Sequence, residues 1–184
     1  MFFKEEEMAT KRTIFLIIFF VMGLSTQLFA QDYTHEVKAK GMTFSWKIEG
    51  SELKVKLSAR TTGWVGIGFN PTNQMKNANF ILGYVKQGKA QIVDDFGIYS
   101  NAHKRDDEIG GTRNVTLLGG TEKGGFTIIE FSIPLDSGDK ADTIIDPDGE
   151  TLVLLAYGSD RDSFISKHKE KTALKIQLTS GKVL

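Results

Sequence analysis

Two side chains in this sequence have the chemistry to bind one metal centre through neutral ligands. Met75 lies in the polar stretch 72–77, where an apolar residue has no obvious reason to be buried, and His168 lies far downstream. A thioether sulfur and an imidazole nitrogen together give six-coordinate haem iron its electron-transfer form. The simpler interpretation is that Met75 folds back onto the domain and that His168 is a solvated member of a basic stretch. Residue types alone leave both interpretations open.

The segments that would position these ligands alternate with period two, as β-strands do. Leu53, Val55 and Leu57 alternate with polar neighbours, and Gly-rich turns separate similar segments. No long segment has a helical stripe. The sequence therefore predicts an all-β, immunoglobulin-like antiparallel β-sandwich. The predicted strands are 33–40, 42–49, 52–59, 63–69, 79–86, 90–95, 112–118, 124–132, 151–157 and 172–178.

Three longer connections between the predicted strands carry the candidate ligands. They are residues 70–78, 97–111 and 158–171, and they contain Met75, His103 and His168 in that order. Long loops on a rigid sandwich are where binding residues concentrate. A haem also needs an apolar slot that excludes water from its faces. Its candidate lining residues are Trp64, Phe69, Phe80, Tyr84, Tyr99, Tyr157, Phe164 and Ile165.

The composition narrows the class of protein and of cofactor. The chain has 184 residues, with 23 basic and 23 acidic side chains, and this balance does not suggest a nucleic-acid partner. It has no cysteine, which excludes disulfides, thiolate zinc sites, iron–sulfur clusters and covalent c-type haem. Any haem would therefore be non-covalent haem b.

The first 30 residues are expected to be a signal peptide. Lys11 and Arg12 precede an apolar core, and a cleavage site after Ala30 would leave a domain of residues 31–184. Met8 is an alternative start. The apolar run is shorter than the roughly 20 residues of a membrane span, so membrane contact is expected only if the leader is retained. We expect a periplasmic or secreted protein.

Other clusters of chemically active residues have simpler explanations. His103 lies in a run of charges, residues 103–108, that is more typical of a solvated surface than of a metal site. Asp94 and Asp95 could bind calcium with Asp106 or Asp107, but there is no twelve-residue calcium loop, and turn or capping roles are more common. No catalytic motif is present, so an enzyme is the least favoured class.

The region from Gly63 to Leu178 resembles the DOMON domain family. The resemblance rests on Gly63-Trp64-Val65-Gly66-Ile67-Gly68-Phe69, Met75, the segments 78–85, 93–96, 131–135 and 155–158, and His168. The haem-binding branch of this family implies a β-sandwich that holds haem b between Met75 and His168 and passes electrons to a redox partner protein in the envelope or membrane. One departure is Ala78-Asn79, where the family usually has an acidic residue. The alternative is a haem-free DOMON module that binds a carbohydrate or a partner protein.

Overall fold

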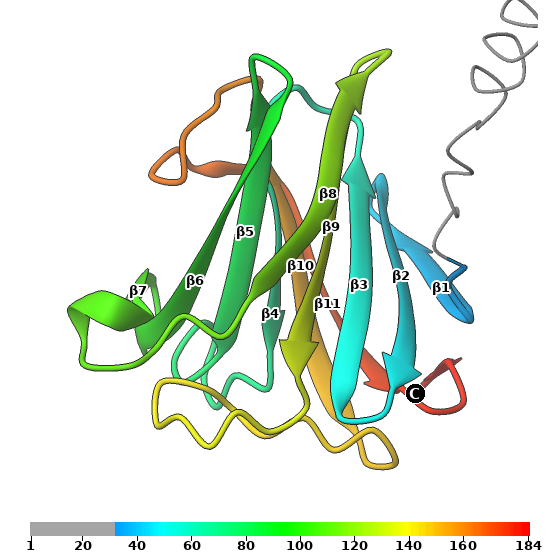
Figure 1. Ribbon diagram of the computed structural model, residues 1–184, viewed down its shortest axis with the longest axis vertical. Coiled ribbons are helices and arrows are strands. Elements are labelled where there is room, and N and C mark those ends of the chain that lie inside the picture. The colour runs from blue at the N-terminus through cyan, green and yellow to red at the C-terminus, as the bar shows by residue number, and fades with distance from the viewer. Residues whose placement is uncertain (1–31) are drawn as a thin grey trace, which may run out of the picture. The chain divides into compact units, whose positions relative to one another are not determined.

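Residues 32–184 form two antiparallel β-sheets that pack face to face in the computed structural model (Figure 1). The predicted leader, residues 1–30, lies outside the described residues. The five-stranded sheet has the order β1 (His35–Ala39), β2 (Met42–Glu49), β3 (Glu52–Ala59), β9 (Phe126–Pro134) and β8 (Thr116–Lys123). The seven-stranded sheet has the order β12 (Lys182–Val183), β11 (His168–Gln177), β10 (Thr151–Gly158), β4 (Val65–Phe69), β5 (Asn79–Lys86), β6 (Lys89–Tyr99) and β7 (Ala102–Arg105). A short 3-10 helix, η1 (Asp106–Glu108), follows β7.

The alternation seen in the sequence produces the core between the sheets. Along β3 every second residue is buried, as expected for a strand with one face on the core. The Phe44 and Trp46 rings stack with centroids 4.5 Å apart, and the Trp46 indole N–H donates to the Leu178 carbonyl at 2.9 Å. The predicted β-sandwich is therefore confirmed.

Strand β4 is buried on both faces, which is the feature that defines the candidate site. Val65, Ile67 and Phe69 face the core between the sheets and are at most 1% exposed. Trp64 and the intervening glycines face the opposite way, toward the outer surface of the seven-stranded sheet. The outer face of this sheet therefore carries a second, smaller apolar cluster.

Two of the predicted long connections are partly strands. Strand β6 continues to Tyr99 and pairs with β7, so that His103 lies in a strand and not in a loop. Strand β11 begins at His168, whose partner is Gly158 on β10. The charged residues at both places suggested loops, but pairing with a neighbouring strand overrides local preference. Strand β8 likewise begins four residues later than predicted.

The outermost strands of both sheets are short or irregular. Strands β7 and β12 have four and two residues, and β8 has an irregular register between Leu117 and Gly119. Among the described residues, no helix is long and apolar enough to span a membrane.

Candidate functional site

The candidate site is the apolar cluster on the outer face of the seven-stranded sheet. We call this set the outer cluster; its buried members are Trp64, Ala78, Phe80 and Leu82. Met75, Tyr84 and Phe164 are partly buried against it. Two connections cover the cluster in place of another layer of secondary structure, namely residues 70–78 and 159–167. The site is thus apolar, and two loops cover it.

Glycines on β4 and β10 make room for the rings of the outer cluster. A Cβ atom built on Gly68 would lie 2.4 Å from the Phe80 ring, and one built on Gly158 would lie 2.3 Å from the Trp64 indole nitrogen. Both distances are far below van der Waals contact, so only glycine fits there. The flat surface that these glycines provide is occupied by the protein's own aromatic side chains.

Residues 70–78, which we call the Met75 connection, are held against the end of β6 by backbone contacts. The Met75 N–H donates to the Ser100 carbonyl at 3.3 Å, and the Met75 carbonyl accepts from the Ala78 N–H at 3.2 Å. Gly97 and Ala78 are also paired, with the Gly97 N–H donating to the Ala78 carbonyl at 2.9 Å. A fixed backbone places the Met75 side chain against the outer cluster.

The 159–167 connection covers the other end of the cluster. The Trp64 indole N–H donates to the Ser166 hydroxyl oxygen at 2.9 Å and lies 3.2 Å from the Ser166 carbonyl. The Phe164 and Tyr84 rings pack with centroids 4.5 Å apart. Trp64 therefore anchors the segment that leads into His168.

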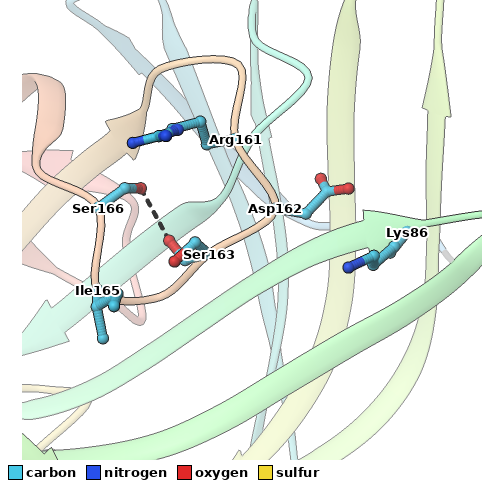
Figure 2. A pocket seen from close by; sticks show the side chains of 6 residues that line it. All are labelled: Lys86, Arg161, Asp162, Ser163, Ile165 and Ser166. Atoms are coloured by element: carbon cyan, nitrogen blue, oxygen red, sulfur yellow. Dashed lines mark hydrogen bonds between the residues drawn. The ribbon is translucent and has the colours of Figure 1, made fainter.

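A polar groove lies beside this connection (Figure 2). Its volume is about 530 Å³, and its lining residues are Lys86, Arg161, Asp162, Ser163, Ile165 and Ser166. The Ser166 hydroxyl donates to the Ser163 carbonyl at 2.8 Å and braces the loop. Ile165 is 97% exposed. Sequence reasoning singled out only Ile165 among these residues, because the groove is created by a loop conformation that no local pattern reveals.

The backbones of Met75 and His168 lie toward opposite ends of β4. His168 pairs with Gly158, whose N–H donates a hydrogen bond to the carbonyl of Trp64, just before β4, whereas the Met75 connection follows the end of β4. The backbones of the two residues are separated by about 20 Å along the strand direction, at ~3.3 Å per residue. Two atoms bound to one metal lie within about 5 Å of each other. Met75 is partly buried and His168 is exposed. Joint ligation of one iron by the two side chains stays a prediction.

The predicted lining residues divide between the two faces of the sheet. Trp64, Phe80, Tyr84 and Phe164 belong to the outer cluster. Phe69 and Tyr157 instead pack in the core between the sheets, which corrects their assignment to the slot. Each lies an even number of residues from core-facing residues of its own strand, so its side chain points to the same side of the sheet. Of the remaining candidates, Tyr99 is 66% exposed.

His103, expected to lie on a solvated loop, has a specific partner. Its Nδ1 atom lies 2.5 Å from Oδ2 of Asp95, and its ring packs against Phe80 with centroids 5.4 Å apart. Asp94, on the same strand, accepts from the backbone N–H groups of Asn114 and Val115 at 2.7 and 3.1 Å. The capping role predicted for Asp94 therefore holds for one of its oxygens.

Known proteins resemble the chain in sequence and in fold. The chain is 33% identical over 112 residues to DBH-like monooxygenase protein 1 of Homo sapiens and 30% identical over 138 residues to putative DBH-like monooxygenase protein 2 of the same species. These matches cover 61% and 73% of the chain but only 18% and 26% of the relatives.

Two solved cytochrome b domains share the fold. They belong to pyranose dehydrogenase from Coprinopsis cinerea, with a TM-score of 0.59 and 14% identity, and to cellobiose dehydrogenase from Myriococcum thermophilum, with a TM-score of 0.55 and 10% identity. The matches cover 77% and 76% of this chain and 78% and 79% of those chains. Identities this low support the fold alone.

The family model of the DOMON domain matches residues 38–158, which is well over half of the chain. The matched range runs from within β1 to the end of β10, includes β4 and Met75, and ends before His168. This chain belongs to the DOMON domain family.

Proposed function

We propose that this chain is an extracytoplasmic DOMON module that binds its ligand on the outer face of the seven-stranded sheet. The observation that carries the proposal is the outer cluster, which Met75 contacts from one connection and Phe164 from the other. When loops cover an apolar face, a loop movement can admit a ligand. A face that is covered by a second sheet cannot open in this way. We infer a binding or electron-transfer role and not catalysis.

Haem b is the ligand that we propose first for this face. The thioether of Met75 and the imidazole of His168 suit haem iron chemically, and the fold shared with two cytochrome b domains supports the choice. When bound, haem supplies a one-electron redox couple. The chain's own contribution would be to exclude water with Trp64, Phe80 and Leu82. Exposed Lys167 and Lys169 flank His168 and would meet an acidic redox partner of the cell envelope.

The two proposed ligands start from different surroundings. His168 is exposed at the start of β11, and the Trp64–Ser166 hydrogen bonds hold the segment that leads into it. Met75 already contacts the cluster, so the two ligand roles are separate hypotheses that need separate variants.

The test is the visible absorption spectrum of the haem-reconstituted full chain, before and after dithionite. Sharp split bands on reduction are expected for low-spin six-coordinate iron. Met75→Leu is expected to give a five-coordinate or high-spin spectrum, and His168→Ala to lose most of the haem. His35→Ala is the matched control, since His35 lies in β1 of the other sheet. A wild-type spectrum in His168→Ala would reject that ligand, and a folded protein without a Soret band would reject haem binding altogether.

A haem-free module that binds a partner protein is the second candidate, and the polar groove favours it. Ile165 is almost fully exposed and lines the same groove as the charged residues Arg161, Asp162 and Lys86, a combination suited to binding a protein surface (Figure 2). A carbohydrate is less well suited, because Trp64, whose ring could stack on a sugar, is only 5% exposed. Ile165→Asp is expected to weaken partner binding while leaving the melting temperature unchanged.

A further inference from the structure

Three carboxylates from three separate segments meet at the end of the sandwich that carries the Met75 connection. Asp94 lies on β6, Asp106 is the first residue of η1, and Asp142 lies between β9 and β10. One ligand atom from each lies within 4.8 Å of those from the other two. They are far apart in sequence, so the fold itself assembles this group. We call it the acidic triad.

The carboxylate of Asp106 is buried and has no hydrogen-bond partner. Asp106 is 0% exposed and Asp94 is 4% exposed. Within residues 32–184, neither side-chain oxygen of Asp106 accepts a hydrogen bond, and Oδ1 of Asp94 has no partner either. Buried carboxylates are normally paired or hydrogen-bonded, because an isolated buried charge is strongly unfavourable. Three buried carboxylate oxygens of the triad therefore lack a partner among the described residues.

The remaining oxygens of the triad are held in place by neighbouring groups. Asp142 accepts from the side-chain amides of Asn79 and Asn114 at 2.6 and 2.9 Å and from the Ser137 hydroxyl at 2.5 Å. Oδ2 of Asp94 accepts two backbone N–H groups, as described above. The amide oxygen of Asn79 is also buried without a partner and is a candidate neutral ligand. The carboxylates are thus oriented before any ligand binds.

Nearby basic side chains do not neutralise the triad. Arg105 pairs with exposed Asp107 at 2.6 Å, and His103 pairs with Asp95. In the part of the chain that the structure describes, no ion pair involves any of the three triad carboxylates. Their negative charge must therefore be balanced by protons or by a bound cation.

Protons are the competing explanation. Burial, followed by the charge of Asp142, raises the pKa of Asp94 to about 7. Burial, followed by the charges of Asp94 and Asp142, raises the pKa of Asp106 to about 8. The metal-free triad would therefore hold protons near neutral pH. A divalent cation would displace them and use the same oxygens as ligands.

The ligand chemistry favours calcium over the other divalent cations. All the donors are oxygen atoms, which select hard cations such as Ca²⁺ and Mg²⁺. Mg²⁺ usually keeps several waters and uses one or two carboxylates, whereas Ca²⁺ accepts many protein oxygens in flexible geometry. We propose that Asp94, Asp106 and Asp142 bind a calcium ion that ties β6, η1 and the β9–β10 connection together.

The test measures calcium binding and thermal unfolding of the chelator-treated, haem-free full chain at pH 7.5. Calorimetric titration with CaCl₂ is expected to give one site per chain. At about 100 times the dissociation constant, Ca²⁺ should raise the melting temperature by about 5–11 °C. MgCl₂ at the same concentration should raise it much less. None of these readouts depends on haem, so they are independent of the proposed function.

Matched aspartate variants identify the ligands. Asp106→Asn removes one charge without changing the side-chain shape and should abolish both the binding heat and the calcium-induced shift. Asp107→Asn is the control, because Asp107 lies next to it in η1 but is exposed. Circular dichroism would verify that both variants are folded, and Asp142→Asn repeats the test from another segment. Calcium binding that survives in both Asp106→Asn and Asp142→Asn overturns the proposal, as does a wild-type protein that binds no Ca²⁺ or responds to Mg²⁺ alone.

Discussion

Gly97 packs so closely against the Met75 connection that any side chain at this position should destabilise the fold. A Cβ atom on Gly97 would lie 1.7 Å from the Met75 carbonyl oxygen and 2.8 Å from its carbonyl carbon. Both are backbone atoms and cannot rotate away. In Gly97→Ala the Met75 connection must move by more than 1 Å, roughly the difference from an ordinary contact distance of about 3.5 Å.

That movement is expected to destabilise the fold by about 3 kcal/mol. Overpacking alone costs roughly 1–3 kcal/mol, and each backbone hydrogen bond lost between the connection and β6 adds about 1 kcal/mol. The expected decrease in melting temperature is about 6–12 °C for a domain of this size. If Met75 binds haem iron, haem affinity should fall as well. Urea unfolding and a thermal scan measure the stability directly.

Gly119→Ala is the matched control for this experiment. Gly119 also lies in a strand, but nothing lies within 4 Å of the position that a Cβ atom would take there, and its φ is not in the left-handed region. Its replacement should change the unfolding free energy by less than about 1 kcal/mol. If Gly97→Ala and Gly119→Ala unfold with equal free energies, the tight packing of the Met75 connection on β6 is refuted.

Two further predictions concern the 159–167 connection, which covers the outer cluster, and the acidic triad. Trp64→Phe removes the hydrogen-bond donor to Ser166 and should lower the free energy of unfolding by about 1 kcal/mol. It should also increase amide hydrogen exchange in residues 159–167, as measured by mass spectrometry. Unchanged exchange there would show that the hydrogen bond does not hold the connection. The folded-state pKa values of Asp94 and Asp106, about 7 and 8, lie above the ordinary value of 3.8. The stability that their protons contribute is complete below about pH 4 and is lost as the pH rises through 7 to 8, so chelated protein should lose about 6 kcal/mol between pH 5 and pH 8 in urea unfolding. Asp106→Asn should flatten this dependence, and an equally steep profile in that variant would contradict the assignment.

The strands were predictable because burial on one face leaves period-two alternation in the sequence. Leu53, Val55 and Leu57 show this pattern, and they are buried as the alternation requires. Which side of a strand faces the core was harder to predict. Phe69 was predicted to line a ligand slot, yet it is in phase with core-facing Val65, and only the choice of face decides its environment.

Contacts between distant segments could not be predicted in the same way. His168 begins a strand because β10 offers a pairing partner, and nothing in its charged surroundings indicates this. The distance between Met75 and His168 depends on strand order and register, which the spacing of residues in the sequence does not determine. Asp142 was not singled out, since its relation to Asp94 exists only after β6 and the β9–β10 connection have packed together.

The irregular outer strands have a consequence for how the protein behaves at high concentration. A long, regular outermost strand offers unpaired N–H and C=O groups on which a second copy can build a continuous intermolecular sheet. Strands β7 and β12 are too short to template such growth, and the irregularity between Leu117 and Gly119 interrupts β8. Strand β1 alternates charged Glu36 and Lys38 along its outward face. The described domain should therefore resist amyloid-like assembly, even though strands dominate its structure.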